Sequence, residues 1–402
     1  MNTTRVRAEI DLDAISENLA VIRHHAGTRV RVLLVVKADA YGHGAVAVAH
    51  HAVRLGISAL GVGTTAEALE LRASGLRVPI LVLGTIVDEE AEDALRHGIE
   101  LGVHSSDRLA RLEEVARRVG QTARVHLNID TGMGRLGVPP ARAIDLLRAI
   151  DATPSLELAG VMSHLSSSRG ALDPLTTVQA QAFARVLASA EELGLRRGVT
   201  HLANSAAIFT GLRPLYDTVR PGLSAYGALP EGVPGSDGLR PAMRLCSQVV
   251  FLKDMPAGAT VGYDSTWRAP RATRVATLPL GYDDGVPWRL GNRGEVLIRG
   301  QRAPIVGRVS MDYTTIDVGH VPGASVGDEV VLLGSQLGEH ITVTELAHGA
   351  GTIPYEVLSA IGKRVPRVFI GGEDLVLHPA PSGRLLPGAA SHEAARPLSE
   401  RS

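Results

Sequence analysis

A lysine beside a loop crowded with reactive side chains is the first feature of this sequence that could do chemistry. Lys37 ends an apolar run at residues 32–36, and the loop that follows contains Asp39, Tyr41 and His43. A lysine at a strand end usually packs its methylenes and extends its amine into water. A buried lysine instead has a depressed pKa, and its amine can form a Schiff base. The reactive loop favours the second interpretation.

Four further clusters of polar residues and glycines could act together with Lys37. They occupy residues 130–135, 163–164, 203–205 and 220–223. Each cluster alone has an ordinary explanation, such as a solvated arginine or a helix N-cap. All five clusters come directly after short apolar segments, so a shared position at the ends of strands is the simpler interpretation.

The elements that position these clusters alternate between strand and helix over the first 220 residues. The predicted strands are residues 30–36, 59–63, 80–83, 101–103, 125–129, 158–161, 200–202 and 218–220. The predicted helices are residues 13–25, 45–55, 64–74, 88–97, 106–119, 140–150, 175–193 and 205–210. This alternation predicts a (β/α)8 barrel of the TIM type, whose active site lies at the carboxyl ends of the strands.

Phosphate groups in such barrels are commonly bound after the seventh and eighth strands. The Ser205 hydroxyl lies at one of these positions, and the backbone N–H groups of Gly222 and Leu223 lie at the other. Turns and helix starts that present N–H groups bind anions. The Tyr41 hydroxyl is available from the first loop. We therefore expect a phosphate site on this side of the barrel.

The sequence changes character after Gly238. Short β-rich segments punctuated by Gly and Pro predict a mostly β C-terminal domain at residues 239–378, after a barrel at residues 1–238. The predicted strands are residues 245–252, 273–280, 295–298, 305–309, 314–318 and 329–333, with helices near Thr342 and at residues 354–361. Residues 230–238 are the expected linker. Residues 379–402 lack periodicity, and we expect them to be a disordered tail.

Composition and charge exclude several classes of function. The 402 residues carry a net charge of -1 and no basic block, which argues against nucleic acid or an anionic membrane as a partner. Cys246 is the single cysteine, so no intrachain disulfide can form. No apolar run has membrane-spanning length, and the charged N-terminus is unlike a signal peptide. We expect a cytoplasmic protein with a small substrate and no metal, because the histidines show no ligand spacing.

The clusters resemble the motifs of alanine racemase, a pyridoxal-phosphate enzyme with an α/β barrel followed by a β domain. The barrel motifs are VVKADAYGHG at residues 35–44, DTGMGRLG at 130–137, HLANSAA at 201–207 and RPGLSAYG at 220–227. The later motifs are VGYD at residues 261–264, LGYDDG at 280–285, VGRVSMD at 306–312 and IPYE at 353–356. The resemblance covers about residues 9–373, which leaves out only the tail.

The resemblance implies that Lys37 carries pyridoxal 5'-phosphate as a Schiff base and acts as a base on one face of the substrate Cα. It implies that Tyr263, contributed by the other subunit of a homodimer, is the base on the opposite face. Racemisation needs both, because one base removes the proton and the other returns it from the opposite side. The product, D-alanine, would supply bacterial cell-wall peptidoglycan.

Further site residues follow from the same resemblance. The implied cofactor contacts are Lys37, Tyr41, Arg135, His164, Asn204, Ser205, Arg220, Gly222, Leu223 and Tyr355. The implied substrate contacts are Arg135, Met311 and Asp312, and the implied entryway residues are Tyr282, Arg308 and Ile353. Met311, like Tyr263, would act across the subunit interface.

Arg220 is implied to hydrogen-bond the pyridine nitrogen of the cofactor. A guanidinium only donates and stays charged, so it keeps that nitrogen unprotonated and should limit side reactions such as transamination. A tyrosine ordinarily has a pKa of about 10, so a tyrosine base also needs positive charge nearby. Arg220 and His164 are the expected sources of that charge.

Asn128 departs from the family pattern. Many members have a lysine, often carbamylated, two residues before the aspartate of the DTGMGR motif, and asparagine cannot form that anion. One hypothesis is that a bound chloride replaces the missing negative charge beside a buried Arg135. The other is that Asn128 hydrogen-bonds Arg135 directly.

Two other activities stay open on the sequence alone. Asn128 could accompany a racemase that acts on serine or on several amino acids, although Tyr355 at the pocket wall favours a small substrate. A pyridoxal-phosphate-dependent decarboxylase can share the barrel-plus-β architecture, but the racemase-type motifs around Tyr263 and Met311 argue against it. His43 has no assigned role.

Overall fold

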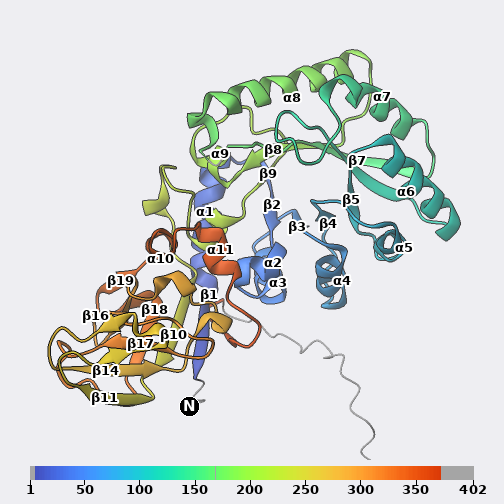
Figure 1. The fold of residues 1–402 in the computed structure, drawn as a ribbon. Helices are drawn as coiled ribbons and strands as arrows, with labels where there is room; N and C mark the ends of the chain where they lie inside the picture. The colour runs from blue at the N-terminus through green and yellow to red at the C-terminus, as the bar shows by residue number, and fades with distance from the viewer. Residues whose placement is uncertain (1–4, 168, 373–402) are drawn as a thin grey trace, which may run out of the picture.

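The computed structural model describes residues 5–167 and 169–372 and consists of an α/β barrel beside a mostly β domain (Figure 1). The barrel is closed by eight parallel strands in chain order, and β2 pairs with β9 to complete it. They are β2 (Arg31–Val35), β3 (Ala59–Val62), β4 (Ile80–Val82), β5 (Glu100–Val103), β6 (Ala123–Asn128), β7 (Leu156–Met162), β8 (Val199–Asn204) and β9 (Thr218–Arg220). The predicted (β/α)8 barrel is confirmed.

Helices follow the barrel strands and pack their apolar faces on them. They are α3 (Ala45–Arg54), α4 (Thr65–Ala73), α5 (Asp88–Arg96), α6 (Ser106–Val119), α7 (Pro140–Asp151), α8 (Pro174–Glu192) and α9 (Ser205–Phe209). Side chains at their starts explain where several of them begin. Thr64 and Glu67 form a capping box at the start of α4, and Ser105 caps α6 by accepting from the N–H of Arg108.

The β domain contains a seven-stranded sheet, a three-stranded sheet and a short two-stranded ribbon. The large sheet has the order β16-β15-β18-β10-β1-β20, and β19 extends from β18. Its strands are β1 (Val6–Asp11), β10 (Met243–Gln248), β15 (Glu295–Ile298), β16 (Gln301–Pro304), β18 (Glu329–Gln336), β19 (Glu339–Ile341) and β20 (Arg367–Ile370). The smaller sheet is β11 (Phe251–Met255), β14 (Thr273–Leu278) and β17 (Thr314–Asp317), and the ribbon is β12 (Thr260–Val261) with β13 (Trp267–Arg268).

The first strand of the chain lies in the sheet of the second domain. β1 pairs with β10 and β20, and α1 (Leu12–Ala26) then leads to the barrel. The predicted boundary assigns residues 6–11 to the barrel domain, residues 1–238. In the structure these residues are a strand of the large sheet, whose other strands all lie in the second predicted domain, residues 239–378. The sequence pattern had predicted no strand before residue 30.

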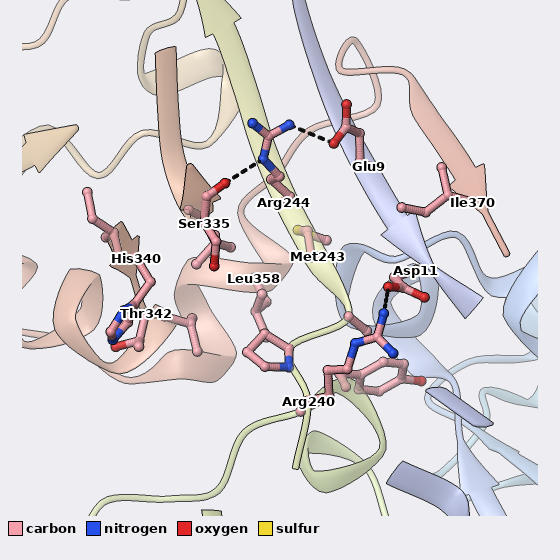
Figure 2. Close-up of a pocket in the computed structure, with 18 of the residues that line it drawn as sticks. Glu9, Asp11, Arg240, Met243, Arg244, Ser335, His340, Thr342, Leu358 and Ile370 are labelled. Carbon is pink, nitrogen blue, oxygen red and sulfur yellow. Dashed lines mark hydrogen bonds and ion pairs between the residues drawn. The ribbon is translucent and has the colours of Figure 1, made fainter. Parts of the chain in front are cut away.

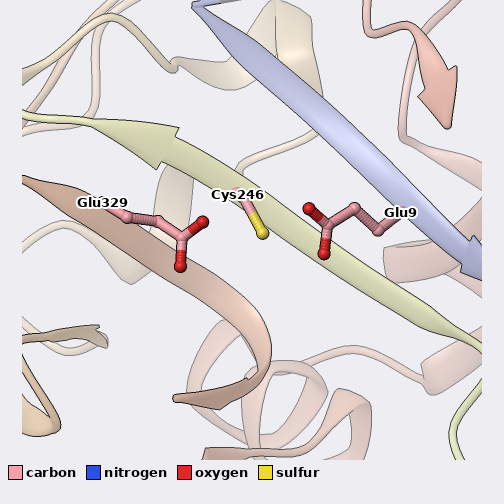
Figure 3. A group of neighbouring side chains, drawn as sticks. All are labelled: Glu9, Cys246 and Glu329. Atoms are coloured by element: carbon pink, nitrogen blue, oxygen red, sulfur yellow. The ribbon is translucent and has the colours of Figure 1, made fainter. Parts of the chain in front are cut away.

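Ion pairs hold β1 in that sheet. Glu9 and Glu329 flank Cys246 on three neighbouring strands (Figure 3). Arg7 lies 2.7 Å from Glu9 and 2.6 Å from Glu329, and Arg244 pairs with both carboxylates. Burial opposes the ionisation of Glu9, but the hydrogen bonds from Arg244 and Arg7 outweigh it and lower its pKa. These partly buried pairs join the N-terminal strand to the β domain.

Two predicted strands differ from the structure. The segment predicted as one strand at residues 245–252 is split between β10 and β11, so the chain passes there from the large sheet to the small one. Residues 305–309 form no strand; only Ile305 makes a bridge, to Ile316, and the neighbouring β16 is the true strand. An apolar run cannot distinguish one long strand from two short ones that change sheets.

The linker and the last two helices agree with the sequence pattern. The expected linker at residues 230–238 is irregular and ends in a 3-10 turn, Ser236–Gly238. Thr342 caps α10 (Val343–Ala350), which confirms the helix predicted near that residue, and α11 (Pro354–Ser359) begins as predicted but ends before the predicted residue 361. The predicted tail at residues 379–402 lies outside the described residues. Within them, no helix is both long and apolar enough to cross a bilayer.

Candidate functional site

The loop after Lys37 has an unusual backbone. Residues 38–41 all adopt the left-handed helical conformation, with φ between 52° and 54°. This conformation costs a non-glycine residue roughly 1–2 kcal/mol. A run of four persists only if surrounding contacts determine it, and such strain is typical of functional sites.

Contacts from three directions hold this turn. The Glu67 carboxylate, at the start of α4, accepts from the backbone N–H of Ala38 at 2.7 Å. The Asp39 carboxylate accepts from the N–H of Ala45 at 2.7 Å and so connects the turn to α3. Arg367 of β20 donates to the carbonyl of residue 42 at 2.9 Å. The position of Lys37 is therefore determined by the barrel and by the β domain together.

His43 closes the same turn. Its Nδ1 lies 3.0 Å from the carbonyl oxygen of Ala40 and 2.9 Å from that of Tyr41, so Nδ1 carries the proton and donates. The ring stacks on Tyr226, with centroids 4.5 Å apart. Complete burial lowers the pKa of His43 to about 4, so the ring is neutral near pH 7. The residue that the sequence left without a role is a structural support for the Lys37 loop.

The environment of Lys37 favours a free amine. Lys37 is exposed at the open cavity, but the protein around its amine partly desolvates it and so lowers its pKa from the usual 10.5; the Arg135 guanidinium lowers that pKa further, against the opposing charge of Glu67. A lower pKa increases the fraction of amine that can act as nucleophile or base. The chemistry expected of Lys37 is therefore supported by its surroundings.

A cavity of about 440 Å³ opens at the carboxyl ends of the barrel strands. The predicted site residues that line it are Lys37, Tyr41, Asn128, Arg135, His164, Asn204, Ser205, Arg220, Gly222, Leu223, Ile353 and Tyr355. Its lining includes one lysine and two arginines, and no described aspartate or glutamate. A cavity with this charge favours an anionic ligand such as a phosphate or a carboxylate.

One wall of the cavity has the features of a phosphate site. The Ser205 hydroxyl accepts from the N–H of Gly222 at 3.0 Å, so the loops after β8 and β9 meet there. Gly222 needs to be glycine, because a Cβ would lie 2.5 Å from the Tyr41 hydroxyl oxygen. The Asn204 side chain caps α9 by accepting from the N–H of Ala207 at 3.0 Å. Asn204 thus fixes the start of α9 beside this wall.

Arg220 is buried at the cavity wall and held through both terminal nitrogens. Nη2 donates to the carbonyl of Ser163 at 2.7 Å, and Nη1 donates to His201 Nδ1 at 3.0 Å. Burial lowers the pKa of Arg220 to about 10, so it is charged near pH 7.

Burial, followed by the charges of Arg220 and Arg135, lowers the pKa of His164 to about 3. The expectation that His164 supplies positive charge is wrong, because its ring is neutral.

Arg135 also differs from the expectation. It is exposed in the described chain rather than buried, and the cavity offers it no carboxylate partner. Asn128 is buried at the end of β6 and lines the same cavity. No hydrogen bond joins the side chains of Asn128 and Arg135 among the described contacts, so the direct-bond hypothesis is not supported.

The other predicted site residues lie outside the cavity. These are Tyr263, Tyr282, Arg308, Met311 and Asp312, all in the β domain. Tyr263 is 71% exposed and Met311 52% exposed. Arg308 lies over the ring of Trp288 at 5.0 Å. A single chain therefore does not bring these residues to Lys37, and their action on a partner's cavity stays a prediction.

Three ionisable residues that the sequence motifs did not indicate lie beneath the cavity. Glu100, His126 and His201 are buried inside β5, β6 and β8. Barrel interiors are usually filled by branched apolar side chains. An acid or imidazole within an otherwise apolar strand was the signal that could have identified them.

A second cavity, of about 510 Å³, lies beside β10 and α10 and differs in character (Figure 2). Its arginines are already paired: Arg244 contacts Glu9 at 2.8 Å, and Arg240 pairs with Asp11 and Glu17. None of the predicted site residues lines it. The cavity at the barrel rim, with its unpaired positive charge, is therefore the candidate active site.

Comparison with known proteins gives matches over both domains. The family model for the alanine racemase N-terminal domain matches residues 10–230, and that for the C-terminal domain matches residues 242–369. The alanine racemase of Geobacter sulfurreducens is 41% identical over 376 residues, which is 92% of this chain and 98% of the relative. That of Desulforamulus reducens is 41% identical over 90% of this chain and 98% of the relative.

Solved structures give the same result. The alanine racemase from D-cycloserine-producing Streptomyces lavendulae has a TM-score of 0.87 and 38% identity, covering 92% of this chain and 98% of that one. The alanine racemase from Streptomyces coelicolor A3(2) has a TM-score of 0.86 and 35% identity, covering 91% of this chain and 98% of that one. The similarity in fold therefore extends across the barrel and the β domain.

Proposed function

Because this chain belongs to the alanine racemase family and is thus an amino-acid racemase, an isomerase, we propose that it interconverts L-alanine and D-alanine. The observation that carries the proposal is the cavity at the barrel rim. It combines Lys37, whose pKa is lowered, with Arg220 and the wall built by Ser205 and Gly222. D-alanine made there would serve bacterial cell-wall peptidoglycan.

Pyridoxal phosphate is the cofactor that fits this cavity. Tyr41, Ser205 and the backbone of Gly222 and Leu223 would hold the phosphate, and the bare Cα of Gly222 lets the Tyr41 hydroxyl lie directly beside that backbone. Lys37 would be the attachment point, and Arg220 would face the ring nitrogen. The chemistry that the bound cofactor supplies is electron withdrawal from the substrate Cα, which acidifies its proton.

Proton transfer then falls to the protein's own residues. Lys37 would remove or return the proton on one face of Cα, and Tyr263 would do so on the other. With His164 neutral, the arginines of the cavity lining, Arg220 and Arg135, are the charged groups that can stabilise a tyrosine anion. Arg135, Met311 and Asp312 would position the substrate carboxylate.

A homodimer with two shared sites completes the proposal. Its support is the exposure of Tyr263 and Met311 on the β domain, away from the cavity of their own chain. Exposed aromatic and methionine side chains are typical of interfaces. Tyr282 and Arg308 would line the entryway with Ile353, which is 57% exposed at the cavity mouth.

Mixing two inactive variants tests the shared sites. Lys37→Ala and Tyr263→Phe chains should each be inactive alone. A mixed dimer would have one site with both defects and one with neither, so co-refolding equal amounts should restore about one quarter of wild-type activity. Mixtures that stay inactive while forming mixed dimers would rule out a site shared between subunits.

Substrate identity needs a separate experiment. Purified protein is incubated with L-alanine and with L-serine, and D-enantiomer and CO2 are followed. We expect D-alanine without CO2, and less D-serine. Release of CO2 would show that the protein is a decarboxylase and would contradict the proposed racemisation. Faster formation of D-serine than of D-alanine would favour a serine racemase.

A chloride beside Asn128 and Arg135 is the last part of the proposal. Arg135 is a charged group without a carboxylate partner in the cavity, and Asn128 can donate to an anion. We expect activity to depend on halide, and bromide to bind at this position in crystals. Activity that does not depend on halide, together with no bromide at this position, would contradict the chloride site.

A cytoplasmic location is also proposed, because a chain with a single cysteine is compatible with a reducing compartment.

A further inference from the structure

A buried chain of hydrogen bonds runs from Arg220 through the barrel to its opposite end. Arg220 Nη1 lies 3.0 Å from His201 Nδ1, and His201 Nε2 lies 2.9 Å from His126 Nδ1. His126 Nε2 lies 2.9 Å from a carboxylate oxygen of Glu100. The other oxygen of Glu100 accepts from Arg124 Nε at 2.9 Å. Four strands thus contribute to one continuous path.

The chemistry of the two ends fixes every proton along this path. Arg220 can only donate, so His201 Nδ1 must accept and its proton must be on Nε2. That proton points to His126 Nδ1, which must accept in turn, so His126 also carries its proton on Nε2. The Glu100 carboxylate is the final acceptor. Both imidazoles are therefore neutral and share one orientation of donor and acceptor.

The path also connects Arg220 to a counter-charge. Arg220 is 5% exposed and forms no ion pair with a described carboxylate; its other partners are backbone carbonyls and His164. Glu100, 6% exposed, is the one buried acid on the described barrel strands. Hydrogen bonds from His126 and Arg124 lower the pKa of Glu100 despite its burial. A buried guanidinium without such a partner would be costly.

The strands are shaped to accommodate the path. The pairing of β6 with β7 shifts register between Val125 and His126, which re-aims the His126 side chain. Gly160 of β7 faces this ring, and a Cβ there would lie 2.4 Å from His126 Nδ1. The φ of Gly160 is not in the left-handed region, so space rather than backbone conformation explains the glycine.

We propose that Glu100 and His126 are positioning residues, which act through His201 to fix the orientation and the charge of Arg220 at the cavity wall. The inference rests on the proposed function, in which Arg220 faces the cofactor's ring nitrogen. A guanidinium held in one orientation excludes water and protons from that nitrogen. Loss of the path therefore increases abortive transamination relative to racemisation.

Histidine protonation provides a test that does not depend on activity. Protein labelled with 15N-histidine is examined by NMR with and without pyridoxal phosphate. We expect unprotonated Nδ1 and protonated Nε2 for both His126 and His201. Glu100→Leu, which removes the acceptor, should change the pattern at His126. A protonated Nδ1 on either ring of the wild-type protein would overturn the assignment.

Reaction partitioning provides the second test. Transamination converts alanine and the bound cofactor into pyruvate and the pyridoxamine form in equal amounts, so pyruvate per racemisation turnover is measured. Glu100→Leu should raise this ratio and lower kcat, each roughly tenfold, with KM for alanine within about twofold. Glu100→Gln, which keeps an acceptor but loses the charge, should give a smaller effect in the same direction.

Glu157→Gln is the matched control. Glu157 pairs with the same Arg124 at the surface but contacts neither Glu100 nor the two histidines, so this variant should behave as wild type. If the pyruvate ratios of both Glu100 variants equal that of Glu157→Gln, the proposal is overturned. Should the protein catalyse no racemisation at all, the proposed function fails, but the histidine spectra still decide whether the path exists.

Discussion

Replacing Gly222 by alanine tests the contact on which the phosphate wall depends. A Cβ at this position would lie 2.5 Å from the Tyr41 hydroxyl oxygen and 3.0 Å from Cζ. Ordinary carbon contacts are about 3.5–4.0 Å, so the Tyr41 ring must retreat by roughly 1 Å. Tyr226 and Tyr355 restrict that movement, because their ring centroids lie 5.1 and 5.8 Å from that of Tyr41.

Overpacking of this kind costs roughly 1–3 kcal/mol. Because Tyr41 and Gly222 both belong to the proposed phosphate site, we expect the cost in cofactor binding, as an affinity loss of roughly 5- to 150-fold. Removing the Tyr41 hydroxyl removes the closest atom. Gly222→Ala should therefore be much less harmful in a Tyr41→Phe background than in the wild type.

The assay is an equilibrium titration of apo-protein with pyridoxal phosphate, followed by cofactor absorbance, for the wild type, both single variants and the double variant. We expect a coupling energy of at least about 1 kcal/mol between the two sites. If Gly222→Ala lowers the affinity for pyridoxal phosphate by the same factor in the wild type and in the Tyr41→Phe background, the reasoning is refuted. Urea unfolding of each apo-protein shows whether stability, rather than the site, has changed.

Three other predictions follow from the site. Lys37→Ala should abolish both turnover and the visible absorbance of the bound cofactor; retained absorbance would exclude Lys37 as the attachment point. Tyr263→Phe should keep that absorbance but slow racemisation by roughly 10²- to 10⁴-fold, more from L-alanine than from D-alanine, as measured by isotope exchange at Cα in each direction. Burial lowers the pKa of His43 from 6.5 to about 4. Below pH 6.5, His43 therefore binds a proton in the unfolded chain but stays neutral in the folded protein until the pH approaches 4. The free energy of unfolding should fall by roughly 2 kcal/mol per such histidine from pH 7 to pH 5, and His43→Asn should remove that part of the loss in urea unfolding.

The barrel was predictable because its strands have a local signature. Each parallel strand is buried on both faces and therefore forms a short apolar run, such as β4 at Ile80–Val82. The β domain was less predictable, since its strands are half-exposed and change partners. β1 illustrates the limit: residues 6–11 alternate buried and half-buried side chains, but their charges obscured the strand.

The site was predictable to the extent that its residues follow barrel strands. Lys37, Ser205 and Arg220 were placed correctly at the rim because topology alone brings those strand ends together. The charge state of His164 was not predictable, since it depends on burial and on two arginines from other segments. The residues beneath the rim were missed for the same reason, because their role appears only when four strands are adjacent.

The sequence by itself determined the alternation of strands and helices, the positions of the polar clusters after those strands, and the family. Period and motif are local properties of the chain, so they can be recognised without knowledge of tertiary contacts. Only the tertiary structure decided that β1 joins the second domain, that residues 38–41 turn left-handed, and that Arg220 is connected to Glu100. Each of these depends on contacts between segments distant along the chain, whose energies no local pattern encodes.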